Sequence, residues 1–199
     1  MVHRKKRKQS SDNKNLLIDR LQPGEAANIL RGLLAGHPEL ETEAEDIAKA
    51  ALRQGGFEVI GDDICDAIQA LGFDELNGRA GHHKRGYVEP DEAAADILHE
   101  TITPFLDDLR RRLDLRLGDE ALEMCKGLVL GCYRLEHEGG GELLEYASEF
   151  PAETAAYAVE SWRDGSGGLK RTVVLPGDFV EQFVPEWADM IARICLKRR

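Results

Sequence analysis

The stretch from 118 to 137, GDEALEMCKGLVLGCYRLEH, predicts the most hydrophobic helix of this chain. Asp119 is a residue type that caps helix starts, and the glycines at 139–141 end the pattern. Apolar side chains recur between these limits at the three- and four-residue spacing of a helix with a buried face: Leu122, Cys125, Leu128, Val129, Cys132 and Leu135. Because further apolar residues flank this face, we expect Leu128 and Val129 to lie at the centre of the core.

Similar patterns on both sides predict about eight helices, over residues 23–36, 40–52, 62–71, 90–113, 119–135, 151–162, 178–184 and 186–196. The first two are joined by a short connection and predict an αα-hairpin. Pro104 lies inside the fourth and should kink it. Only Val173-Val174-Leu175 suggests a strand. We therefore predict an all-α fold, an irregular bundle or a solenoid-like array of helix pairs, although no motif repeats at a constant period.

The composition is that of an ordinary globular protein, with 42% hydrophobic and 32% charged residues. No apolar run approaches the roughly 18 residues that a membrane helix needs. We expect one helical domain over residues 15–199, preceded by a disordered tail over residues 1–14. The chain has four cysteines without a CxxC pair, and no export signal, so we expect reduced thiols and a cytoplasmic protein.

Charge is divided unevenly along the chain. Residues 1–15 carry six basic side chains and one acid, a formal charge of +5, and since the whole chain carries −11, residues 16–199 carry −16. The basic residues include an uninterrupted run: Arg4, Lys5, Lys6, Arg7 and Lys8. Such a tail could bind nucleic acid, acidic lipid or an acidic protein, act as a localisation address, or only keep the chain soluble. Nucleic-acid binding through it would be nonspecific and sensitive to salt.

The segment from 72 to 90 is poor in apolar residues and predicts the longest loop. It contains a cluster of basic and aromatic residues that we predict as an anion- or partner-binding site: Arg79, His82, His83, Lys84, Arg85 and Tyr87. Arginine forks and protonated histidines can converge on a phosphate or carboxylate. The alternative is a solvated connection whose cations lean on acidic helices, such as the one that starts at Asp91 and Glu92.

Sequence motifs of catalysis are missing. There is no nucleophile elbow, and the glycine-rich segment at 165–172 lacks the spacing of a P-loop. His137 stands between two glutamates, but no second histidine at metal-binding spacing accompanies it. We therefore expect no catalytic residues, no metal and no cofactor, although an enzyme of unfamiliar type stays an alternative.

These observations predict a noncatalytic helical protein that acts by protein–protein interaction or as a scaffold. The alternative is a nucleic-acid-associated accessory protein that acts through the basic tail and the basic loop at 79–85. We expect a protein partner first. Nucleic acid is the second candidate, bound through the tail only, and we expect no binding to a membrane. The sequence leaves the partner, the pathway and the oligomeric state open.

Overall fold

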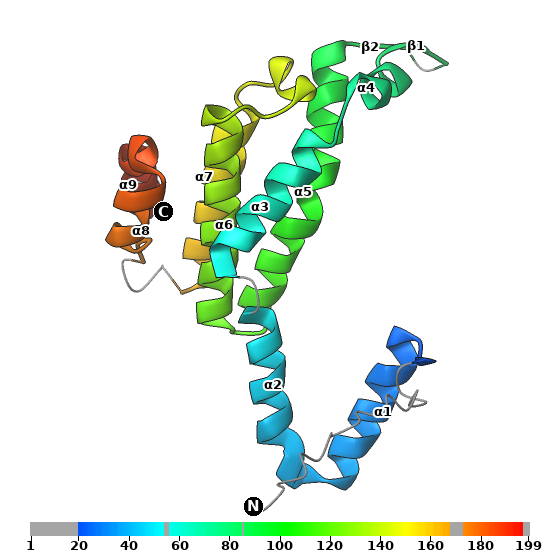
Figure 1. Cartoon of the computed structure of the whole chain (residues 1–199), viewed down its shortest axis with the longest axis vertical. Coiled ribbons are helices and arrows are strands. Elements are labelled where there is room, and N and C mark those ends of the chain that lie inside the picture. The colour runs from blue at the N-terminus through cyan, green and yellow to red at the C-terminus, as the bar shows by residue number, and fades with distance from the viewer. Residues whose placement is uncertain (1–19, 54–55, 85, 168–172, 197–199) are drawn as a thin grey trace, which may run out of the picture. The chain divides into compact units, whose positions relative to one another are not determined.

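The structure is a computed structural model, and it describes residues 20–53, 56–84, 86–167 and 173–196. These residues form nine α-helices and one two-stranded sheet, which confirms the all-α prediction (Figure 1). The helices are α1 (Pro23–Gly36), α2 (Glu41–Arg53), α3 (Gly56–Gln69), α4 (Phe73–Arg79), α5 (Pro90–Asp114), α6 (Gly118–His137), α7 (Phe150–Gly165), α8 (Gly177–Phe183) and α9 (Ala188–Leu196). The strands are β1 (Gly81–His83) and β2 (Gly86–Val88), and short 3₁₀ turns are η2 (Pro38–Leu40), η3 (Glu142–Glu145) and η4 (Pro185–Trp187). A repeating arrangement of helix pairs stays a prediction.

The chain divides into two compact units, with the boundary between Ala48 and Lys49, where the sequence predicted one helical domain. The predicted disordered tail over residues 1–14 lies outside the described residues. In the first unit, Pro23 starts α1, and the Glu25 carboxylate accepts a hydrogen bond of 3.0 Å from the Gln22 backbone N–H. The 3₁₀ turn η2 then leads into α2, so both helices of the predicted pair are present.

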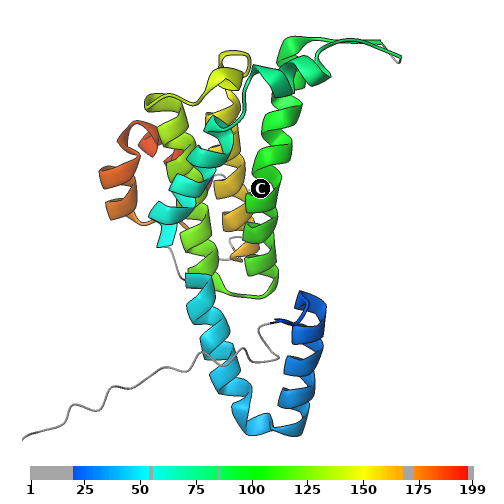
Figure 2. The same cartoon turned by 45° about the vertical axis from the view of Figure 1, so that its right-hand side comes forward.

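The second unit is built around α6, which packs against α3, α5 and α7 (Figures 1 and 2). Leu128 and Val129 of α6 have no exposed surface, which confirms that this helix is the centre of the core. The long helix α5 continues through Pro104 without interruption. On its N-terminal side, the Thr101 and Thr103 hydroxyls donate to the carbonyl oxygens one turn earlier, at 2.9 and 2.6 Å.

Helix α3 begins earlier than predicted. The sequence suggested a start at Asp62 or Asp63, but α3 starts at Gly56, so this boundary was wrong. The physical reason is a cap from a distant part of the chain: the Glu123 carboxylate of α6 accepts a hydrogen bond of 3.2 Å from the Phe57 backbone N–H. Asp62 instead lies within α3 and pairs with Arg134 of α6 at 2.5 Å.

Two other local predictions were wrong. The segment from 72 to 90 is not simply a loop, because it contains α4 and the antiparallel pair β1–β2. Conversely, residues 173–175 form no strand. Leu175 is buried as a single side chain against the core rather than through pairing with a neighbouring strand. Over the described residues, no helix combines the length and apolar character needed to cross a bilayer.

Candidate binding surfaces

The basic cluster predicted from the sequence lies on a β-hairpin, formed by β1 and β2. Its register pairs Gly81 with Val88, His82 with Tyr87, and His83 with Gly86. Gly81 and Gly86 have φ values of 103° and 142°, which side-chain-bearing residues rarely adopt, so glycine permits the chain to enter and turn here. The hairpin projects beyond the helices of its unit (Figures 1 and 2).

An ion pair fixes the base of the β-hairpin to α5. The Arg79 guanidinium forms two hydrogen bonds with the Glu100 carboxylate, one of which, from Nη1 to Oε1, measures 2.7 Å. The hydrogen bond from Arg79 lowers the pKa of Glu100, and the same pairing raises the pKa of Arg79. His83 Nε2 also donates to the Arg79 carbonyl oxygen at 2.6 Å. The guanidinium is therefore directed to a carboxylate of the same chain rather than to an anion shared with the histidines.

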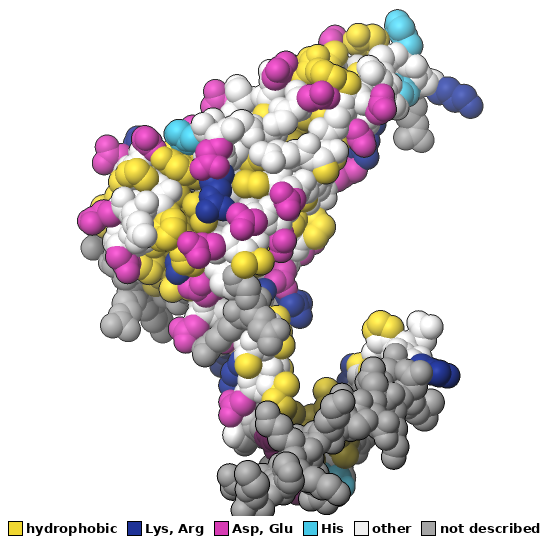
Figure 3. Space-filling view, viewed as in Figure 1, with side chains coloured by type: hydrophobic (Ala, Val, Ile, Leu, Met, Phe, Trp, Pro, Cys, Tyr) yellow, Lys and Arg dark blue, Asp and Glu magenta, His cyan; other side chains and the backbone are white. Residues whose placement is uncertain are grey.

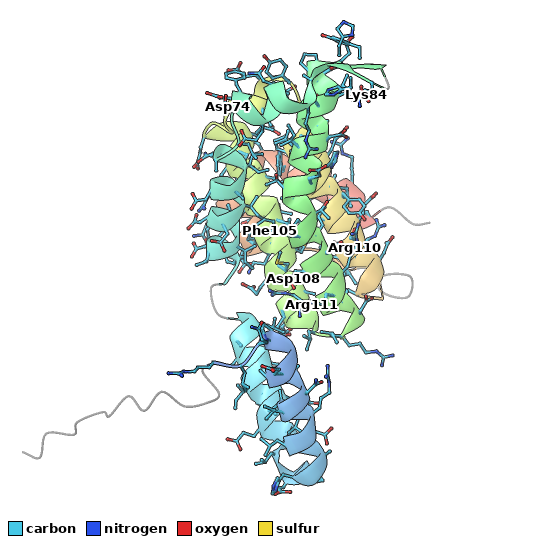
Figure 4. The ribbon with its side chains drawn as sticks, turned by 90° about the vertical axis from the view of Figure 1, so that its right-hand side faces the viewer. Asp74, Lys84, Phe105, Asp108, Arg110 and Arg111 are labelled. Atoms are coloured by element: carbon cyan, nitrogen blue, oxygen red, sulfur yellow. The ribbon has the colours of Figure 1, made fainter. Side chains whose placement is uncertain are left out.

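The other described residues of the cluster, His82, Lys84 and Tyr87, face solvent. The rings of His82 and Tyr87 form an edge-to-face pair with centroids 5.0 Å apart, and Tyr87 is 52% exposed. Lys84 lies at the far end of the β-hairpin (Figure 4). Arg85 lies outside the described residues, and so does the basic run at 4–8. Figure 3 shows acidic side chains spread over the visible face of the helical body, with side chains coloured as His and as Lys or Arg visible at the hairpin end.

A second candidate surface lies on α1. Ile29, Leu30 and Leu33 share one face of this helix by their three- and four-residue spacing, and they are 53%, 49% and 47% exposed. We call these three residues the apolar stripe of α1. Helix α1 buries none of its residues, and Ile47 of α2 is exposed as well. Sequence periodicity predicted an apolar face on this helix but could not show how much of it is exposed among the described residues of its unit.

A groove of about 350 Å³ lies between α5 and α7, and its lining includes Arg110 and Tyr157. Arg110 donates to the Tyr157 hydroxyl at 2.5 Å and to Asp107, and its guanidinium carbon is 5.5 Å from the Tyr157 ring centroid. The hydrogen bond from Arg110 lowers the pKa of Tyr157. These polar groups therefore satisfy one another, and sequence reasoning had no signal for their pairing across 47 residues.

The environments of the cysteines and of His137 indicate a role in packing rather than in a binding site. Cys125 and Cys132 are fully buried, as predicted, and burial raises the pKa of both thiols. The His137 ring stacks on Tyr133 with centroids 4.1 Å apart, and its Nδ1 donates to the Tyr133 carbonyl oxygen at 2.9 Å. In the part of the chain that the structure describes, no three histidine, cysteine or carboxylate side chains are placed to hold a metal ion.

The chain matches no protein-family model, no curated protein and no solved structure.

Proposed function

We propose that this protein is a noncatalytic interaction protein, and that the apolar stripe of α1 is the surface on which a partner docks. The observation that carries the proposal is the exposure of the stripe. Ile29, Leu30 and Leu33 are each about half exposed in a helix that buries none of its own residues. Full burial of one exposed side chain of this kind contributes about 1.5–3 kcal/mol, so a partner that covers the exposed half of all three gains roughly half of that for each.

The length of α1 supports a docking role. An isolated helix of 14 residues is only marginally stable in water, and most helices in proteins depend on the packing of their apolar face. A partner that covers the stripe therefore also stabilises α1 itself. The occupant that fits best is a second amphipathic helix, because apolar residues at i, i+3 and i+4 on two helices interdigitate.

Charge determines which helix would fit. Residues 20–48 contain two arginines and six carboxylates: Glu25, Glu39, Glu41, Glu43, Glu45 and Asp46. Residues 20–48 therefore carry a formal charge of −4, so an acidic partner would be repelled beside α1 and α2, whereas lysines and arginines around an apolar face would be attracted. We therefore propose a basic amphipathic helix of another protein as the occupant.

The noncatalytic part of the proposal is supported by the state of the nucleophilic side chains. Cys125 and Cys132 lie in the core with a raised pKa, which disfavours the reactive thiolate. The four cysteines also favour a reducing compartment, because none of them forms a disulfide, so a cytoplasmic location is part of this proposal.

Binding of designed peptides tests the proposal directly. Two labelled helical peptides would carry the same stripe of leucines on one face. One peptide would have lysines and the other glutamates on its remaining faces. Fluorescence anisotropy should show that the lysine peptide binds the full chain, with affinity that falls as salt rises, and that the glutamate peptide binds far more weakly. Replacing Leu30 and Leu33 by aspartate should weaken binding of the lysine peptide by about tenfold or more.

The control variant is Leu115→Asp, which introduces one of the two negative charges of the double variant, at a residue that is 57% exposed after α5. It should bind the lysine peptide as the wild type does. Equal binding by Leu30→Asp/Leu33→Asp and by Leu115→Asp would mean that the peptide does not contact the stripe, and would refute docking on α1. Sedimentation of the chain without peptide tests whether the occupant is a second copy of this chain. A stable dimer that is lost in the double variant would show that it is, in place of a basic helix of another protein.

A further inference from the structure

The β-hairpin differs in charge from the rest of its unit. Residues 80–88, AGHHKRGYV, contain two permanent cations and two histidines and no acid, in a chain with 37 acids among 199 residues. The hairpin also projects beyond the acidic helices (Figures 1 and 3). Anionic ligands are repelled by the body as a whole, so a contact with one is most favourable at this projecting end.

The aromatic residues of the β-hairpin indicate which class of anionic ligand it would bind. His82 and Tyr87 are cross-strand partners, so their rings lie on the same face of the hairpin. Their edge-to-face contact holds the Tyr87 ring in place while half of its surface stays exposed. Lys84 follows on the same hairpin, at its turn. An exposed planar ring on a hairpin whose turn carries a cation is suited to a nucleotide, with the base on the ring and the phosphate on the cation.

Hydrogen bonds at the base of the β-hairpin hold the two strands in position. Two paired strands of three residues have little stability of their own. The double hydrogen bond between Arg79 and Glu100 and the bond from His83 to the Arg79 carbonyl oxygen fix the hairpin to α5.

We propose that the β-hairpin is a contact site for single-stranded nucleic acid, in which one base stacks on Tyr87 and an adjoining phosphate pairs with Lys84. An acidic peptide or an anionic lipid surface would use the cation but would gain nothing from the exposed ring. A duplex would keep its bases stacked inside and would bring more phosphates toward the acidic helices. The proposal is independent of the docking role of α1, because it uses other residues.

Oligonucleotide binding by the full chain tests this proposal. The probe is a labelled thymidine decamer, and its anisotropy is followed at low salt and across a salt series. All proteins carry glutamine in place of Arg4, Lys5, Lys6, Arg7 and Lys8, so that the side chains of residues 1–15 carry no net charge. Tyr87→Ala should then weaken binding about 5- to 150-fold, the effect of losing one base–aromatic stack. Lys84→Gln should lower the slope of log affinity against log salt by about 0.7, the loss of one phosphate contact on a single strand.

Tyr146→Ala is the matched control, because Tyr146 is 41% exposed but lies after η3, outside the hairpin, and this variant should bind as the wild type does. Unchanged thermal midpoints exclude unfolding as the cause of any loss. Failure of the tail-neutralised wild type to bind the decamer, or equal binding by Tyr87→Ala, would overturn the proposal. So would binding of polyglutamate or phosphatidylserine vesicles that equals binding of the decamer and does not depend on Tyr87.

Discussion

Gly131 of α6 lies directly against Gly61 of α3: a Cβ atom on Gly131 would stand 3.0 Å from the Gly61 carbonyl oxygen. One turn earlier, a Cβ atom on Gly127 would be 2.5 Å from the side chain of Ile60. The small residues at 127 and 131 therefore let the two helix backbones approach closely. This contact determines where α3 lies on the central helix and, with it, how Phe57 reaches its cap on Glu123.

Gly127→Ala should destabilise the protein by about 1–3 kcal/mol, because the added methyl group has no space against Ile60 and the Phe57 carbonyl oxygen. Chemical denaturation measures the change. The control is Gly32→Ala in α1, which meets nothing within 4 Å and should be neutral or stabilising, since alanine favours helix. If Gly127→Ala left the free energy of unfolding unchanged, the close approach of α3 and α6 would be incorrect.

Lys126 should contribute to stability through its ring contacts as well as its charge. Its Nζ lies 4.0 Å from the Phe57 ring centroid and 2.7 Å from a Glu123 oxygen, and the side chain is only 13% exposed. Lys126→Met removes the cation and should cost about 1–2 kcal/mol, because the cation–π interaction is lost and Glu123 keeps an uncompensated charge. Lys126→Arg, which keeps the cation, should recover most of the loss. Equal stability of all three proteins would show that the contact contributes nothing.

The thiols should react with a thiol reagent in an order set by burial. Cys125 and Cys132 are fully buried, and burial raises the pKa of each thiol, so both should be unreactive in the native protein at pH 8. Cys65 is partly exposed and should react first, although burial also raises its pKa. Mass spectrometry of labelled peptides, before and after denaturation, gives the order. Rapid native labelling of Cys132 would contradict the core described above.

Asp108 should make stability depend on pH in the acid range. Burial disfavours its charge, but hydrogen bonds and charges from Arg111 and Arg112 outweigh burial, so its pKa lies below the ordinary value (Figure 4). Because the folded pKa is depressed, the stabilisation is present above the unfolded value of about 3.9 and is lost as pH falls through the folded pKa.

Asp108→Asn should therefore lower the free energy of unfolding by about 1–3 kcal/mol at pH 7, since buried Arg112 loses its ion-pair partner. The difference from the wild type should shrink as pH falls below about 4. Urea denaturation at pH 7 and pH 3 tests both statements. A difference that stays constant across this range would assign the effect of the variant to something other than the charge of Asp108.

The sequence was sufficient for features that depend on local periodicity. Helical spacing and helix-opening prolines located α1, α5 and α7, and the density of apolar residues located the core at Leu128 and Val129. Features that depend on distant partners were missed. The cap of α3 comes from Glu123, 66 residues away, and the glycines at 127 and 131 carry no periodic signal that distinguishes close packing from flexibility.

In the candidate sites, too, the sequence located residues by local pattern but did not predict their contacts with distant residues. Local composition identified the basic cluster at 79–87, because three cations and two histidines fall within residues 79–85 without an acid. It could not show that Arg79 is held by Glu100, 21 residues along the chain, while Tyr87 stays exposed beside His82. Likewise, periodicity predicted an apolar face on α1, and only the arrangement of the helices shows that this face is exposed in the described residues.

Hydrogen–deuterium exchange of the α1 amides tests the central claim, that the apolar stripe of α1 is an open docking face. In the free full-length chain, residues 23–36 should exchange much faster than the amides of α6, because α1 buries none of its residues. The basic leucine–lysine peptide should slow exchange in α1 while leaving α6 unchanged, and should have no effect on Leu30→Asp/Leu33→Asp. Exchange in α1 as slow as in α6 before any peptide is added, or exchange that the peptide does not alter, would contradict the claim.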